Sequence, residues 1–311
     1  MDNIINCKEI AEEILLEVSR MDNIINCKEI AEEILLEASR SVQEIVEQTG
    51  DVPRLAVIIV GDDPASQVYV RNKIRRCEAV GIESNTIRLS ADITEAQLLS
   101  HVAELNLDPH THGILVQMPL PHHINEDNVI NSILATKDVD GLHPFNQAQL
   151  MNNKEPRLDP CTPAGVMRIL NKVYDNDISG GRAVVIGRSR LFGKPMVQML
   201  LNANATVTTC HSRTVREDMK EITRGSDIVI SAIGKPHYFD GSDISDWSTV
   251  IDVGINRLED GSLVGDVNTQ DVIDQQPNVA ITPVPGGVGI LTTAMLMLNT
   301  IKAYKIQKGA S

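Results

Sequence analysis

Apolar residues follow two alternating patterns along most of the chain. A continuous apolar run at residues 55–60 ends at Gly61, which predicts a buried strand followed by a turn. The next segment, 64–80, opens with Asp and Pro and predicts a helix. The same rhythm continues with strands expected at 86–89 and 113–117 and helices at 94–105 and after Asn125. Strands that alternate with helices are typical of βαβ units on a mostly parallel sheet.

A second α/β series is expected after a fresh helix start. Thr162 suits the N-cap and Pro163 the first helical position, so a helix to about Val173 is expected to link two domains. The pattern then predicts strands at 182–186, 206–210, 227–230 and 249–253, helices from 194 and near 215–223, and a final helix to about Tyr304. We therefore expect two α/β domains. The first is residues 21–160 completed by the C-terminal helix 290–311, and the second is 161–289.

The chain begins with a duplication. Residues 1–20 and 21–40 are identical except that Val18 is replaced by Ala38. Each copy predicts a short strand and an amphipathic helix, and a core has room for one such element. The second copy runs directly into the rest of the domain, so we expect the first to be redundant.

Composition and charge exclude several classes of protein. The formal net charge is −14 and aromatic residues are 3% of the chain, which argues against nucleic acid or an anionic membrane as a partner. No apolar stretch reaches transmembrane length and no secretory signal is seen. Five scattered cysteines without a C-x-x-C pair favour reduced thiols in a cytoplasmic protein and predict no metal site.

The helix expected at 64–80 carries the clearest candidates for catalytic residues. Tyr69 and Lys73 are four residues apart, so they share one helix face just past the carboxyl end of a strand. A phenol and an amine placed together there form a plausible proton-handling pair.

A loop that suits a nucleotide follows the first strand of the second domain. Gly187 ends that strand and Gly193 opens a helix, although the full G-x-G-x-x-G spacing is absent and an ordinary βα turn stays an alternative. The next strand ends without the acid that NAD-binding folds place there. Arg188, Ser212 and Arg213 would suit a 2′-phosphate, so NADP is favoured, unless Arg213 simply lies in solvent.

Three further segments could supply a substrate site. Gln117 ends a buried strand, where its amide could bond a lysine, and Asp140 lies in a glycine-flanked loop, where it could accept hydrogen bonds from a nitrogen-rich ring. The loop Pro285-Gly286-Gly287-Val288-Gly289 allows close backbone approach. Each feature alone is more often a strand cap, a turn or a bend than part of a site.

Taken together, these segments resemble the bifunctional methylenetetrahydrofolate dehydrogenase/cyclohydrolase family over residues 21–305. The resemblance rests on motifs found here in the family's order: YVRNK, ILVQMPLP, KDVDG, PCTPAGV, GRSxxxGKP, CHSRT, DVGIN and TPVPGGVG. It implies an N-terminal catalytic domain, a C-terminal Rossmann-type NADP-binding domain and an active site in the cleft between them.

The resemblance also implies roles for individual residues. Lys73 matches the catalytic lysine, Gln117 the residue that bonds it, Tyr69 the tyrosine of the folate site and Asp140 the acid that grips the pterin ring. The implied folate site also includes Val116, Met118, Pro285, Gly286, Gly287, Val288 and Gly289. The implied NADP site consists of Gly187, Arg188, Ser189, Ser212, Arg213 and Ile255.

The implied function belongs to one-carbon metabolism. A member of this family would oxidise 5,10-methylenetetrahydrofolate with NADP+ and hydrolyse the product to 10-formyltetrahydrofolate, as a homodimer. Two alternatives stay open: another two-domain dehydrogenase of the shikimate type, and a folate- or nucleotide-binding protein without activity. A short-chain dehydrogenase is disfavoured because its Tyr-x-x-x-Lys follows the glycine loop, whereas here the pair precedes that loop.

Overall fold

The computed structural model describes residues 23–309, which form two compact units. The three-stranded unit comprises Glu29–Lys172 and residues 290–309, and the five-stranded unit comprises residues 23–28 and Val173–Gly289. This division assigns residues 161–172 to the three-stranded unit, whereas the sequence pattern began the second domain there. The expectation that residues 1–20 are redundant lies outside the described residues.

The three-stranded unit is built on a short parallel sheet. Strands β1 (Arg54–Val60), β2 (Glu83–Leu89) and β3 (Gly113–Val116) lie in the order β2-β1-β3. Leu55, Val57 and Ile59 of β1 pack on one face, while Ile58 and Val60 pack on the other, as the period of two in a strand requires. Because both faces are covered, β1 reads as a continuous apolar run.

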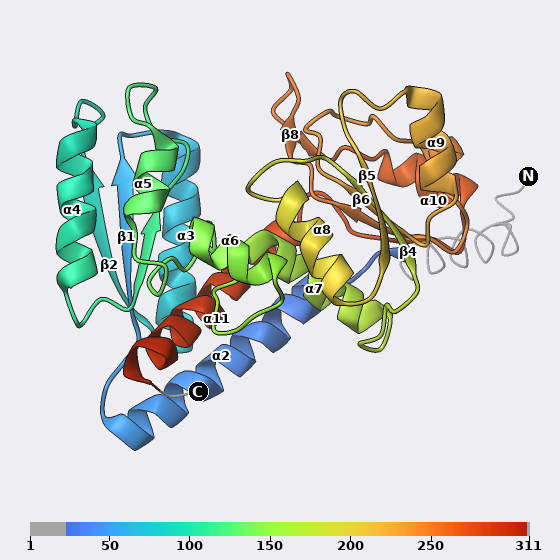
Figure 1. Ribbon diagram of the computed structural model, residues 1–311. Helices are drawn as coiled ribbons and strands as arrows, with labels where there is room; N and C mark the ends of the chain where they lie inside the picture. The colour runs from blue at the N-terminus through green and yellow to red at the C-terminus, as the bar shows by residue number, and fades with distance from the viewer. Residues whose placement is uncertain (1–22, 310–311) are drawn as a thin grey trace, which may run out of the picture. The chain divides into compact units, whose positions relative to one another are not determined.

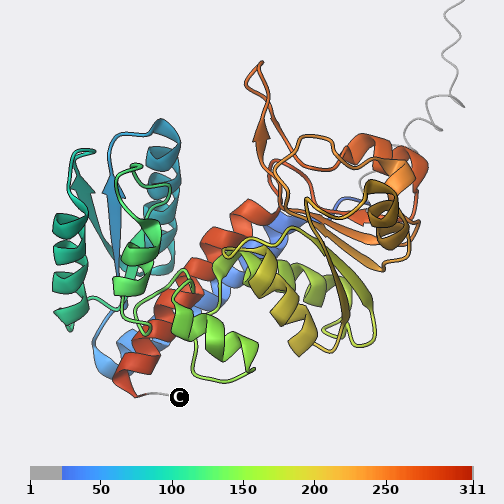
Figure 2. The ribbon, with the colours of Figure 1, turned by 45° about the horizontal axis from the view of Figure 1, so that its top comes forward.

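Helices cover both faces of this sheet. Figure 1 shows α3 (Pro64–Val80) and α4 (Glu95–Leu107) on either side of β1 and β2. The long helices α2 (Cys27–Thr49) and α11 (Val288–Lys308) lie side by side in Figures 1 and 2, and Thr49 Oγ1 lies 3.2 Å from Tyr304 Oη. The remaining helices of this unit are α5 (Glu126–Ser132), α6 (Pro144–Met151) and α7 (Cys161–Val173).

A parallel sheet with a Rossmann-type crossover forms the core of the five-stranded unit. Its order is β10-β7-β6-β4-β5, formed by β4 (Arg182–Ile186), β5 (Thr206–Cys210), β6 (Ile228–Ser231), β7 (Thr249–Asp252) and β10 (Ala280–Ile281). The chain leaves β4 for β5 on one side and then crosses to β6 on the other. Such a switch point opens a crevice at the carboxyl ends of the strands, where ligands of α/β folds bind.

Short elements complete the five-stranded unit. They are helices α8 (Gly193–Asn202), α9 (Arg216–Arg224), α10 (Thr269–Gln275) and the 3₁₀ turn η1 (Gly241–Asp243), with a hairpin of β8 (Asn256–Arg257) and β9 (Leu263–Val264). Figure 2 shows this hairpin as a projecting orange arm. The second copy of the duplicated start joins the sheet edge, because Ile25 N donates to Ile281 O at 2.8 Å and Asn23 Nδ2 to Val279 O at 2.7 Å.

Within residues 23–309, no helix is long and apolar enough to cross a membrane.

Candidate functional site

Helix α3 places Lys73 next to the sheet of the three-stranded unit. Asp63 caps the helix by accepting a hydrogen bond from Ser66 N at 2.7 Å, and Gly81 ends it in the left-handed conformation with φ 86°. Val70 and Cys77 are fully buried against the core. These contacts fix the helix, and Lys73 is left half-buried on the flank that faces the end of β3.

Lys73 and Gln117 form a hydrogen-bonded pair. Gln117 follows β3, and its backbone N donates to Ile58 O at 2.8 Å, so its position is set by the sheet. Lys73 Nζ donates to Gln117 Oε1 at 2.9 Å, and Gln117 Nε2 donates to Met118 O at 2.6 Å. The bond to Met118 fixes which way the amide points, so its oxygen, the acceptor, faces the amine.

Asp140 lies within the electrostatic reach of the same lysine. Burial raises the pKa of Asp140, while the positive charge of Lys73 and a hydrogen bond from the Cys161 thiol oppose that rise. Burial and the neighbouring Asp140 charge raise the pKa of Cys161 well above its ordinary value. The structure thus brings Lys73, Gln117 and Asp140 of the expected set together.

Asp138 supports the loop that holds Asp140. Its Oδ2 accepts hydrogen bonds from His143 N at 2.7 Å and Asn146 Nδ2 at 2.9 Å. Burial raises the pKa of Asp138 to about 7, although those hydrogen bonds favour the charged form. The motif around Asp140 therefore contains two acids with different roles. Asp138 holds the loop in place, and Asp140 interacts with the charge of Lys73.

The remaining expected folate residues of this unit differ in exposure. Tyr69 is 51% exposed, one turn before Lys73 on α3. Val116 is buried in β3 and Met118 is half-buried just after it. The loop Pro285–Gly289 belongs to the other unit, and the expected active site between the domains stays a prediction.

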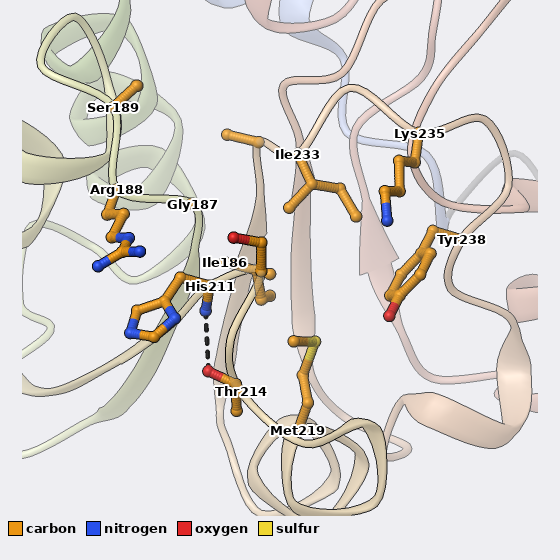
Figure 3. A pocket seen from close by; sticks show the side chains of 12 residues that line it. Ile186, Gly187, Arg188, Ser189, His211, Thr214, Met219, Ile233, Lys235 and Tyr238 are labelled. Carbon is orange, nitrogen blue, oxygen red and sulfur yellow. Dashed lines mark hydrogen bonds between the residues drawn. The ribbon is translucent and has the colours of Figure 1, made fainter.

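A pocket of about 310 Å³ lies at the switch point of the five-stranded unit (Figure 3). Residues at and after the ends of three neighbouring strands line it: Ile186, which ends β4, with Gly187, Arg188 and Ser189 after it, His211, Ser212 and Thr214 after β5, and Ala232, Ile233, Lys235 and Tyr238 after β6, with Met219 of α9. Figure 3 shows Arg188 and His211 on one side of the pocket and Lys235 and Tyr238 on the other.

The loop after β4 fits a nucleotide phosphate. Gly187 has φ 129°, and a Cβ there would lie 2.6 Å from Ala232 O. A Cβ at Gly193 would lie 2.3 Å from Gly187 O, so both positions require glycine. Ser189 Oγ accepts hydrogen bonds from Phe192 N and Gly193 N at 3.2 Å each, which turns the chain into α8. Arg188 and Ser189 of this loop line the pocket, and α8 begins four residues after Ser189, an arrangement that suits a phosphate.

The expected 2′-phosphate residues lie after β5. Ser212 lines the pocket and is exposed, and Arg213 is exposed beside it. The loop is held by hydrogen bonds from His211 N to Thr214 Oγ1 at 3.0 Å and from Arg213 N to His211 Nδ1 at 3.2 Å. Ile255 is 52% exposed and lies near Gly289, where a Cβ would meet its Cδ1 at 3.7 Å.

Models of two domains of one family match this chain. The catalytic domain of tetrahydrofolate dehydrogenase/cyclohydrolase matches residues 25–140, and its NAD(P)-binding domain matches residues 160–308. Bifunctional protein FolD from Dechloromonas aromatica (strain RCB) is 49% identical over 266 residues, which cover 86% of this chain and 92% of that relative. The chain belongs to the tetrahydrofolate dehydrogenase/cyclohydrolase family.

Solved structures of this family share the whole fold. The bifunctional FolD enzyme from Campylobacter jejuni is 44% identical with a TM-score of 0.86, covering 91% of this chain and 98% of its own. The Trypanosoma brucei FolD structure, complexed with NADP cofactor and inhibitor, is 37% identical with a TM-score of 0.84, covering 91% and 97%. The expected family and the two α/β domains are therefore confirmed, and neither the shikimate-type nor the short-chain alternative is retained.

Several pocket residues were missed by reasoning from the sequence. Ile233, Lys235 and Tyr238 line the wall after β6 of the dehydrogenase/cyclohydrolase fold, and Met219 lines it from α9. A signal was available in the sequence, because Gly234-Lys235-Pro236 follows β6 with two residues in between, and β6 pairs with the strand that precedes the glycine loop. Carboxyl ends of neighbouring parallel strands share one crevice.

Proposed function

We propose that this protein oxidises 5,10-methylenetetrahydrofolate to 5,10-methenyltetrahydrofolate with NADP+ and hydrolyses that product to 10-formyltetrahydrofolate. The observation that supports it most directly is the 2.9 Å hydrogen bond from Lys73 to Gln117, in a chain that belongs to this family across both domains. Both activities appear in the names of its relatives, as in the bifunctional methylenetetrahydrofolate dehydrogenase/cyclohydrolase from Campylobacter jejuni.

NADP is the cofactor that the pocket of the five-stranded unit fits. Gly187 and Ser189 would hold the pyrophosphate beside the start of α8, and Arg188, Ser212 and Arg213 the 2′-phosphate. The strand β5 ends at Cys210 with no acid to repel that phosphate. When NADP+ is bound, its nicotinamide ring is the hydride acceptor. Ile255 would contact the cofactor as well.

The residues of the three-stranded unit would handle substrate and proton. Asp140 accepts hydrogen bonds from the N–H groups of the pterin ring, and Tyr69, with Val116 and Met118, lines the folate site. Lys73 moves the proton when water attacks the methenyl carbon. Gln117 keeps the Lys73 amine in one orientation through its own bond to Met118 O. The loop Pro285–Gly289 would bind the folate as well.

An absorbance assay tests the function. The protein is mixed with NADP+ and methylenetetrahydrofolate, and the formation of NADPH and of the methenyl product is followed; shikimate replaces the folate in a parallel sample. Turnover with the folate alone is expected. Measurable NADP+ binding without turnover of either substrate would favour a binding protein and contradict the proposal.

The Lys73→Met variant separates the two activities. It is expected to lose cyclohydrolase activity by more than about hundredfold, the usual contribution of a proton-transfer group, while it still binds NADP+. Lys172→Met is the matched control, because the Lys172 amine forms ion pairs with exposed Glu29 and Glu33 on α2. A full cyclohydrolase rate in Lys73→Met would remove Lys73 from the proton-transfer role.

The assembly and compartment belong to the same proposal. The charge of −14 supports the absence of a nucleic acid partner, and the free, buried thiols Cys27, Cys77, Cys161 and Cys210 support a cytoplasmic location. The homodimer is proposed from the family resemblance. Sedimentation of the purified protein tests it: a dimer mass is expected, and a monomer mass at every concentration would contradict it.

A further inference from the structure

Two buried carboxylates lie at the carboxyl ends of the strands in the five-stranded unit. Asp252 ends β7 and is 1% exposed, and Asp266 follows β9 and is 0% exposed. Neither lines the pocket at the switch point. A buried carboxylate is costly unless hydrogen bonds compensate it, so the partners of these two acids indicate what they do.

Asp266 gathers donors from the wall of the pocket. Its Oδ2 accepts from Ile233 N at 2.7 Å and Gly234 N at 3.3 Å, and its Oδ1 from Lys235 N at 2.9 Å. Ser231 Oγ, at the end of β6, adds a further bond at 3.1 Å. Three consecutive backbone amides therefore point at one side chain, in the segment from which Ile233 and Lys235 reach the pocket in Figure 3.

The same carboxylate also binds the segment that carries Ile255. Asn256 Nδ2 donates to Asp266 Oδ1 at 3.1 Å, so the start of the β8–β9 hairpin is tied to the wall after β6. A Cβ at Gly254 would lie 2.2 Å from Asp266 Oδ1, which leaves glycine as the residue that fits there. Asp266 thus joins the pocket wall after β6 to the segment that carries Ile255, one of the expected cofactor residues.

Asp252 in turn holds Asp266. Its Oδ1 accepts from Asp266 N at 3.1 Å and from Gly254 N at 2.9 Å, and its Oδ2 from Val267 N at 2.8 Å. A Cβ at Gly265 would lie 1.9 Å from Asp252 Oδ2. The two acids therefore form a continuous link from β7 to the loop after β6.

We propose that Asp266 is a positioning residue for NADP binding, acting through the backbone of residues 233–235 and through Asn256. The inference rests on the proposed function, which places NADP in this pocket. Gly234 and Lys235 are exposed, and without an acceptor below them their amides would bond water in many conformations. A fixed carboxylate selects one conformation before the nucleotide arrives, which lowers the ordering cost of binding.

Asp266→Asn tests this role, since it keeps the shape and replaces one acceptor oxygen with a donor. Charge-assisted bonds to the loop are lost, so we expect NADP+ affinity and the dehydrogenase KM for NADP+ to weaken about tenfold. The cyclohydrolase rate on methenyltetrahydrofolate is expected to stay within about twofold, because Lys73 and Gln117 lie in the other unit. A purely structural role would lower the melting temperature and leave the KM for NADP+ of the folded protein unchanged.

The matched control is Asp227→Asn in the same unit. Asp227 binds Arg182 N at 2.8 Å and the Arg182 guanidinium at 3.0 Å, at the amino end of β4, and it does not line the pocket. It should change stability without changing NADP+ affinity.

Two milder variants keep the test decisive if Asp266→Asn does not fold. Ser231→Ala and Asn256→Ala each remove one donor to Asp266 and are expected to weaken NADP+ binding about two- to threefold. NADP+ affinities equal to that of the unmodified protein in every folded variant would overturn the inference. Absence of NADP+ binding by the unmodified protein would instead overturn the proposed function.

Discussion

Replacing Gln117 with Leu tests how the structure controls its lysine. The substitution keeps the side-chain volume close to that of the amide and removes the acceptor that Lys73 Nζ reaches at 2.9 Å. It also removes the donor to Met118 O at 2.6 Å. The amine is then free to leave the position in which it meets the substrate.

The magnitude follows from the kind of bond that is lost. A hydrogen bond to a charged group contributes about 1.5–3 kcal/mol, and the Lys73–Gln117 pair is half-buried, so water replaces it only in part. If that free energy is used to orient the amine in the transition state, the cyclohydrolase rate falls about ten- to hundredfold. NADP+ affinity should not change, because its pocket lies in the other unit.

The assay compares hydrolysis of methenyltetrahydrofolate with NADP+ binding in the same preparation. Gln307→Leu is the matched control. Gln307 lies on α11 of the same unit, and its Nε2 donates to His112 O at 2.7 Å and not to a residue of the Lys73–Gln117 pair. It should cost stability without a change in kcat. Gln117→Glu sharpens the test, since a carboxylate would stabilise the charged amine and should also slow hydrolysis. Cyclohydrolase kcat within about twofold of normal in Gln117→Leu would refute the reasoning.

Two further predictions concern stability. His112 is fully buried, and burial lowers its pKa to about 4. The unfolded chain therefore takes up a proton near pH 6.5 that the folded protein does not accept. The free energy of unfolding is expected to be highest above that pH and to decrease by about 2 kcal/mol between pH 7 and 5. In urea unfolding at several pH values, the free energy of unfolding of His112→Asn should not show this decrease, whereas that of the exposed control His122→Asn should. An equal dependence of the free energy of unfolding on pH in both variants would contradict the prediction. Deleting residues 1–20 should leave melting temperature and activity nearly unchanged, because the second copy supplies Asn23 and Ile25 to the sheet edge; a large fall in melting temperature would reject this.

Helices and strands could be predicted wherever one clear pattern of apolar positions extends over the whole element. The helix expected at roughly 64–80 and the strand expected at 182–186 agree with α3 and β4. The strand expected at 86–89 begins earlier, at Glu83, because its polar residues pair in register with β1 although they stay at the surface. Helix α6 and the β8–β9 hairpin were not predicted, since elements of eight and two residues show too few periods to stand out from loops.

The sequence could predict the site residues that lie in local motifs. It could predict only in part which of them meet through contacts between distant parts of the chain. Lys73 and Gln117 are 44 positions apart, and only the pairing of β1 with β3 brings them together. Asp266 was not selected at all, because no local pattern marks an acid for which four of the five donors lie 31 to 35 positions earlier. Residues that touch ligands leave motifs in the sequence, whereas residues that hold those motifs in place are visible only in the fold.

Charge placement reconciles an acidic chain with an anionic cofactor. The protein carries a net charge of −14, yet none of the residues described as lining the pocket is an acid, and Arg188 and Lys235 are cations. Asp266, which holds the wall after β6, is buried and accepts hydrogen bonds from five donors. Lys235 Nζ is held 5.1 Å from the centre of the Tyr238 ring, so a positive charge stays at the rim. The pocket can therefore attract phosphate through local potential although the surface as a whole is negative.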